Sequence, residues 1–242
     1  MGKDGKRKGK KEGLPAKAGA GESRLREGRA GLTKEQRAEL ERIDAAVGER
    51  LSGHRLEHVR GVASTAHALA VRYGVDPFEA EAAGLLHDWD KRLTPDELWG
   101  KAVEHGVDLH GFEVGDALLV PLLHGWTAAA SLPALFPELP AAVFRAVERH
   151  TVGSLGMSPL DMVVFVADMV EPTRTGDGAE RLRALVGEVA LDALFAACAR
   201  RSIAYVLETG RPVYPGAVEV WNAYCDRLPE AERAALLRTQ PA

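Results

Sequence analysis

Apolar residues recur every three or four positions along most of this chain from residue 33 onward, which is the spacing of one face of an α-helix. The clearest case lies in residues 53–73 and is followed by Gly74, a residue typical of helix C-termini. Its apolar positions are Val59, Val62, Ala63, Ala66, Leu69, Ala70 and Tyr73. The pattern predicts an amphipathic helix over 53–73.

Other segments repeat the helical period, and several carry helix start signals. The period recurs in residues 138–150, 190–209 and 215–227. Capping-box pairs occur at Thr33 with Gln36 and at Thr94 with Glu97, and prolines suited to a first helical turn occur at Pro77, Pro95 and Pro159. We find neither alternating strand patterns nor repeats at a fixed period. The sequence therefore predicts an all-α fold.

The segment DMVVFVADMV, residues 161–170, is rich enough in β-branched residues to suit a buried strand. Its Ser-Pro start, its length up to Pro172 and its helical neighbours favour a buried helix instead. Asp168 is the informative member, because an unpaired carboxylate among valine, phenylalanine and methionine would cost several kcal/mol or more. We expect a positive group to face it.

Charge divides the chain into a tail and a body. Residues 1–29 carry a net charge of +6, whereas the remainder carries −10. Because the start has almost no large apolar side chain, we expect residues 1–32 to form a disordered basic tail. Such a tail could contact RNA or another polyanion through phosphates, or it could serve only as a solubilising extension. We assign residues 33–228 to the folded domain and residues 229–242 to a short C-terminal helical extension.

Length and composition bound the protein class. A chain of 242 residues, 46% of them hydrophobic, can bury a sizeable core. No apolar run approaches the ~20 residues that a bilayer span requires, and no apolar segment follows the Lys-rich start. Cys198 and Cys225 show no metal-site or disulfide spacing. We therefore expect a cytoplasmic protein with no membrane contact.

Candidate metal ligands occur near the ends of apolar helical segments. His87 and Asp88 close the segment that starts at Pro77, and adjacent side chains can converge only at such a terminus. His58 lies on the flank of the apolar stripe, and His124 and His150 also follow apolar runs. Imidazole and carboxylate ligands together suit Fe, Mn or Zn, and a divalent ion would supply the positive partner of Asp168.

The succession HRLEH, LLHDWDK, LLHGW, ERHTVG, VADMVEPTR and ETGRPVYP resembles the HD-domain superfamily and, within it, the bacterial symmetrical diadenosine tetraphosphate hydrolases. The resemblance covers roughly residues 50–226. It implies a helical HD-domain fold that binds iron, with Mn or Zn as other options. It also implies the metal ligands His58, His87, Asp88 and Asp168.

The resemblance further implies which residues contact the nucleotide. They are Arg55, His58, His124, His150, Thr151, Asp168, Arg174, Pro212, Val213, Tyr214, Pro215, Gly216 and Ala217. The catalytic set would be His87, Asp88, Lys91, His124 and His150. Two runs depart from the family pattern: VGS replaces a TGR or SGR run after the ERHT block, and HGWTAA replaces HAPVGA or HGPVGA.

These observations predict a metal-dependent hydrolase that cleaves diadenosine tetraphosphate symmetrically into two ADP molecules. His124 and His150 could donate to phosphate, bind a second ion or protonate the leaving ADP oxygen, and the residues alone leave this open. Another HD-domain phosphohydrolase, acting on a nucleotide or cyclic dinucleotide, is one alternative. A non-catalytic nucleotide-sensing module, recruited to RNA or a protein partner, is a second. A homodimer is also left open.

The remaining candidate side chains are assigned structural roles. His54, His67, His105 and His110 are expected to be structural or solvated, although His54 has the i, i+4 spacing to His58 that can bind metal. Trp89, Trp126 and Tyr214 could stack on adenine, but packing is the favoured role.

Overall fold

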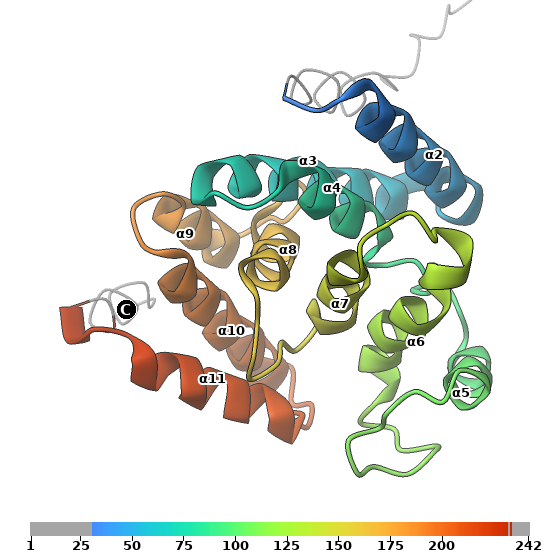
Figure 1. Cartoon of the computed structure of the whole chain (residues 1–242). Coiled ribbons are helices and arrows are strands. Elements are labelled where there is room, and N and C mark those ends of the chain that lie inside the picture. The colour runs from blue at the N-terminus through green and yellow to red at the C-terminus, as the bar shows by residue number, and fades with distance from the viewer. Residues whose placement is uncertain (1–30, 232, 234–242) are drawn as a thin grey trace, which may run out of the picture.

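The computed structural model describes residues 31–231 and 233, and this part of the chain contains ten helices and no strand (Figure 1). The helices are α2 (Lys34–Arg50), α3 (Gly53–Tyr73), α4 (Pro77–Leu86), α5 (Pro95–Glu104), α6 (Val120–Leu135), α7 (Ala141–Arg149), α8 (Pro159–Val170), α9 (Asp177–Leu185), α10 (Leu191–Glu208) and α11 (Pro215–Arg227). The all-α prediction is confirmed. Residues 1–30 of the expected tail (1–32) and residues 234–242 of the expected C-terminal extension (229–242) lie outside the described residues. Leu32, at the expected end of the tail, is instead buried in the core.

Helix boundaries follow the local signals in the sequence. Thr33 and Thr94 both form complete capping boxes, and a third box joins Ser158 to Asp161 at the start of α8. Gly74 ends α3 with φ 72°, a left-handed conformation that glycine adopts without strain. The contested segment 161–170 is a helix, and nearly all of its side chains are buried.

Most helices contribute to the main core, in which α3 packs against α4 and α8, and α4 also packs against α7 and α8 (Figure 1). Gly84 allows α4 to approach α3 closely: a Cβ there would lie 2.7 Å from Cα of Ala63 on α3. This contact brings the end of α4, and the His87-Asp88 pair that follows it, directly against α3. The predicted convergence of helix ends therefore has a physical basis in one missing methyl group.

A second, smaller hydrophobic cluster joins α5 to α6. Its buried members are Leu98, Ala102, Leu119, Leu122, Leu123 and Trp126. Cys198 and Cys225 lie in α10 and α11, and both are free thiols in the described structure. Within that same part of the chain, no helix is both long and apolar enough to cross a membrane.

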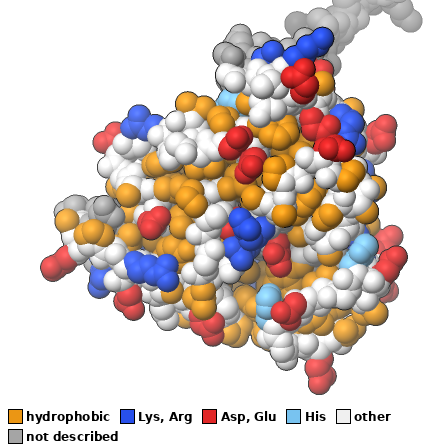
Figure 2. Space-filling view, in the orientation of Figure 1, with side chains coloured by type: hydrophobic (Ala, Val, Ile, Leu, Met, Phe, Trp, Pro, Cys, Tyr) orange, Lys and Arg blue, Asp and Glu red, His pale blue; other side chains and the backbone are white. Residues whose placement is uncertain are grey.

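Charged side chains are scattered over the face drawn in Figure 2, where basic and acidic groups alternate without forming one broad basic patch. A basic surface suited to RNA is therefore not visible on this face. The expected polyanion contact was assigned to the tail, which lies outside the described residues.

Candidate metal centre

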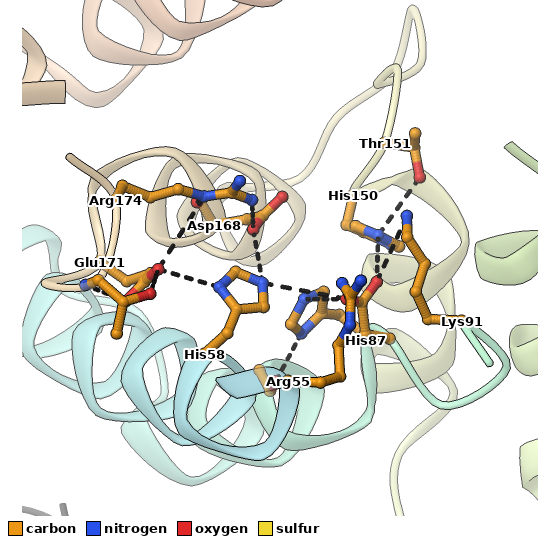
Figure 3. Close-up of polar contacts among 12 residues, drawn as sticks. Arg55, His58, His87, Lys91, His150, Thr151, Asp168, Glu171 and Arg174 are labelled. Atoms are coloured by element: carbon orange, nitrogen blue, oxygen red, sulfur yellow. Dashed lines mark hydrogen bonds and ion pairs between the residues drawn. The ribbon is translucent and has the colours of Figure 1, made fainter. Parts of the chain in front are cut away.

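The four predicted ligands come together from three parts of the fold, and Figure 3 labels three of them, His58, His87 and Asp168. His58 comes from α3, His87 and Asp88 from the end of α4, and Asp168 from α8. His58 Nε2 lies 3.1 Å from Asp168 Oδ1 and 3.9 Å from Asp88 Oδ2, and His87 Nε2 lies 3.7 Å from the same Asp88 oxygen. The structure thus brings all four side chains into one cluster.

Hydrogen bonds at Nδ1 fix the ring orientations of three histidines. His87 Nδ1 donates to the Gly84 carbonyl at 2.7 Å, and His150 Nδ1 donates to the Val147 carbonyl, also at 2.7 Å. His58 Nδ1 donates to Glu171 Oε1 at 2.9 Å. Each ring therefore turns its Nε2 toward the centre of the cluster, as metal-ligating histidines do.

One nitrogen at the centre has no partner. Among the described residues, His87 Nε2 is buried and makes no hydrogen bond, and leaving a buried polar atom unsatisfied costs about 1–3 kcal/mol. Its ring donates through Nδ1, so Nε2 presents a free lone pair. A metal ion is the partner that this atom fits, and the neighbouring carboxylates would balance its charge.

The described residues hold two overlapping ligand groups: His58 with His87 and Asp168, and His87 with Asp88 and His150. Within each group the ligand atoms all lie within 4.8 Å of one another. Asp88 thus falls in a different group from His58 and Asp168, although all four were expected to bind one ion. The reason is that its carboxylate is turned toward Arg55 Nη1, at 2.9 Å, and His124 Nε2, at 3.2 Å.

His124, His150 and Lys91 form the other half of the site. His124 Nε2 lies 3.1 Å from His150 Nε2 and 3.1 Å from Lys91 Nζ. Burial lowers the pKa of His124, and burial with the neighbouring imidazoles of His124 and His87 lowers the pKa of His150 to about 3. Both rings are therefore neutral at pH 7 and available as ligands or proton carriers.

Charge at the first ligand group is distributed unevenly. Burial disfavours a charged His58, but the carboxylates of Asp168 and Glu171 outweigh it and raise the pKa of His58 to about 9. Burial opposes ionisation of Asp168 too, yet His58, His87 and Arg174 hold its pKa well below the usual range. The positive partner expected for Asp168 is thus supplied by His58 and Arg174.

Arg55 and Arg174 stand at the edge of the cluster, with side chains 43% and 45% exposed. Arg55 contacts Asp88, and Arg174 contacts both Oδ1 and the main-chain oxygen of Asp168. Each guanidinium keeps a solvent-facing part that could bind a phosphate oxygen. Lys91 lies nearby, and burial lowers the pKa of its ammonium.

Glu171 was missed from the sequence. It is fully buried, and besides His58 it contacts the backbone N–H of Thr173 at 2.7 Å. Gly61 on α3 makes room for it, because a Cβ there would lie 2.6 Å from Glu171 Oε2. A glutamate directly before a proline at the end of an apolar helix was the available signal.

Two cavities adjoin the site. The first, about 180 Å³ and largely apolar, is lined by Thr151, whose Oγ1 lies 3.3 Å from His150 Nε2. Of the expected nucleotide contacts, it is also lined by Pro212, Val213, Tyr214 and Ala217. Pro215 and Gly216 line the second cavity, of about 370 Å³, which shares Tyr214 and Val152 with the first. The Pro212–Ala217 stretch therefore divides between two cavities.

The remaining candidates lie away from the ligand cluster. His67 is buried and its Nδ1 lies 2.9 Å from Glu81 Oε2, while His54 and His105 are exposed. His110 lies edge-on to Trp126 and lines the second cavity. Trp89 is packed against Phe136.

Comparison with known proteins gives a consistent result. Residues 55–173 match the family described as HD domain. The symmetrical bis(5'-nucleosyl)-tetraphosphatase of Bacillus subtilis (strain 168) is 28% identical over 181 residues, covering 74% of this chain and 93% of that protein. The protein of the same name from Staphylococcus aureus (strain NCTC 8325 / PS 47) is 29% identical over 189 residues, covering 76% of this chain and 94% of that protein.

A solved structure agrees with both. The crystal structure of a predicted HD superfamily hydrolase involved in NAD metabolism from Clostridium acetobutylicum superposes with a TM-score of 0.68 at 26% identity. The match covers 78% of this chain and 97% of that one. Residues 55–173 thus carry an HD domain, and the helical fold and the ligand cluster agree with the hydrolases that the chain resembles.

Proposed function

We propose that this protein is a metal-dependent hydrolase that cleaves diadenosine tetraphosphate symmetrically, releasing two molecules of ADP. One observation carries the proposal: His87 Nε2, buried and without a partner among the described residues, lies in a cluster of carboxylates and further imidazoles. The names of the relatives support the choice of substrate.

Imidazole and carboxylate ligands suit a divalent transition ion, and we propose iron, with manganese or zinc as alternatives. His58, His87 and Asp168 would hold it, and Asp88 and His150, with His87, offer places for a second. When bound, such an ion lowers the pKa of water toward neutrality and screens phosphoryl oxygens.

The residues around the ligands would orient the polyphosphate. Arg55 and Arg174 can each turn a guanidinium donor to a phosphate oxygen while staying close to Asp88 and Asp168. Thr151 lines the cavity and touches His150, so a nucleoside in the cavity would place its phosphates toward the ligand cluster. Holding one ADP half in this way fixes attack at a phosphorus beside the central bridging oxygen.

A proton for the leaving ADP oxygen would come from the second half of the site. Lys91 Nζ lies beside His124 Nε2, and burial lowers its pKa, which makes the ammonium a better acid than an exposed lysine. His124 and His150, both neutral, can accept or relay this proton. We therefore assign Lys91, His124 and His150 to leaving-group chemistry.

Chromatography of the products of diadenosine tetraphosphate tests the proposal. Purified protein supplied with ferrous iron or manganese should yield ADP alone. ATP with AMP, or no turnover with either ion, would contradict it. A panel of mononucleotides and cyclic dinucleotides checks the alternative substrates. The Asp44→Asn variant, altered at an ion pair with Arg60 between α2 and α3, is the control and should keep wild-type turnover.

A further inference from the structure

Asp90 is a second fully buried carboxylate in the turn after α4, two residues beyond Asp88. It is not among the proposed ligands or catalytic groups. Lys101 Nζ lies 2.8 and 2.6 Å from its two oxygens, and Thr127 Oγ1 donates to Oδ2 at 2.8 Å. Arg50 Nη2 approaches Oδ1 at 3.5 Å. A buried charge with this many donors is well satisfied, so its cost is offset locally.

The donors to Asp90 come from three different helices. Arg50 ends α2, Lys101 lies on α5 and Thr127 lies on α6. The α5 and α6 helices share their own small hydrophobic cluster. Asp90 thus ties this helix pair to the turn that carries the His87-Asp88 pair. Arg50 also reaches the main-chain oxygen of Trp89, at 3.4 Å, so the turn is held from α2 as well.

Thr127 links this network to the catalytic side of the site. It lies three residues after His124, one helical turn further along α6, so the two side chains lie on the same face of the helix. Asp88 and Asp90 both lie in the turn after α4. Asp88 contacts His124 at 3.2 Å, and Asp90 contacts Thr127 at 2.8 Å. Two carboxylates of the turn after α4 therefore contact two residues of α6 that lie one helical turn apart.

We propose that Asp90 is a positioning residue that, through Thr127, sets the place of His124 relative to Asp88 and Lys91. Thr127 belongs to the HGWTAA run on α6. A valine here would have no hydroxyl to offer a carboxylate, so the link depends on the hydroxyl of Thr127. Its catalytic meaning rests on the proposed function.

A buried ion pair can also serve stability alone. Variants of Thr127 distinguish this role from the positioning of His124. Thr127→Val has nearly the same shape and leaves Lys101 and Arg50 on Asp90, yet it removes the hydroxyl that links α6 to Asp90. Thr127→Ser keeps that hydroxyl. Asp90→Asn keeps the size of the side chain and removes its charge. Glu81→Gln, another nearly fully buried carboxylate, which contacts His67, is the matched control.

The test measures kcat and KM for diadenosine tetraphosphate and the imidazole resonances of the zinc-loaded, full-length protein. We expect Thr127→Val and Asp90→Asn to lower kcat about tenfold or more with little change in KM, as loss of a supporting partner does. The His124 ring resonance should move in both variants while that of His58 stays. Thr127→Ser should restore kcat, and Glu81→Gln should leave kcat and the His124 resonance unchanged.

Unaltered kcat and an unmoved His124 resonance in Thr127→Val would overturn the proposal, even if Asp90→Asn fails to fold. Equal losses of kcat in Glu81→Gln and Thr127→Val would overturn it too, because they would indicate a general effect of core damage. Wild-type protein that does not cleave the dinucleotide would refute the proposed function instead. In that case the His124 resonance alone still decides whether Asp90 positions this ring.

Discussion

His87 shows how a single residue can combine packing and chemistry. Its Nδ1 is satisfied by the Gly84 carbonyl, and its Nε2 is left facing Asp88 and the other imidazoles. The same ring belongs to both ligand groups in the described structure. No other side chain of the site has that double membership, so His87 is the ligand whose loss should affect metal binding most.

We therefore predict that His87→Ala lowers the metal content of purified protein to background and reduces turnover by about 100-fold or more, since loss of a mere supporting partner already costs 10–100-fold. Elemental analysis and the ADP-release assay measure both quantities. Asp44→Asn serves as the control and should retain its metal. An ion bound at wild-type stoichiometry in His87→Ala would show that the ligand set is wrong.

Glu171 should act on the metal through His58. As an acceptor for Nδ1–H it orients the ring and raises the basicity of Nε2. Glu171→Gln is expected to weaken Mn²⁺ binding about 10–100-fold, measured by titration followed by electron paramagnetic resonance. The exposed Glu188→Gln provides the comparison. Equal Mn²⁺ affinities in the two variants would show that Glu171 does not support metal binding through His58.

At the scale of elements, the contact between α3 and α4 decides where the ligands meet. Gly84→Ala places a methyl group against the backbone of Ala63, which cannot move aside as a flexible side chain could. We predict that it destabilises the fold by about 1–3 kcal/mol, as overpacking does, and displaces His87. Gly100→Ala on α5, where a Cβ meets nothing within 4 Å, should instead be neutral or stabilise by up to about 1 kcal/mol. Urea denaturation measures both.

Much of this element-level picture was predictable from the sequence. Periodicity located α3, α10 and α11, and the Ser-Pro start identified α8 as a helix. Such signals are local, and they act through the residues of the element itself. The sequence also indicated that His87 and Asp88 would be ligand candidates, because they end an apolar helix.

The remaining features depend on how helices rotate and slide against one another. The division of the ligands between two groups follows from the turn of Asp88 toward Arg55 and His124, which no spacing reports. The contact between Asp90 and Thr127 joins residues 37 positions apart. Glu171 reaches His58 only because Gly61 lies opposite. These are tertiary facts, and sequence periodicity carries no information about them.

At the scale of the whole molecule, protonation of His58 should make the stability of metal-free protein depend on pH. A folded pKa of about 9 against 6.5 when unfolded means that the contribution is complete below pH 6.5 and lost as pH rises through 9. The loss is on the order of 3 kcal/mol. As the pH rises from 6.5 to 9, the unfolding free energy of chelator-treated wild type should therefore fall toward that of chelator-treated His58→Gln. A constant difference between the two proteins across this range would contradict the assignment.

The ligands come from helices that are far apart along the chain, from His58 on α3 to Asp168 on α8. An ion held by them acts as a removable crosslink between α3 and α8, and a crosslink that closes a long loop restricts the unfolded chain most. Chelation should then shorten the lifetime of the native state. Faster tryptic digestion after metal removal, reversed when the ion is returned, is the expected sign, so cellular metal supply would govern how long the protein persists as well as how fast it works.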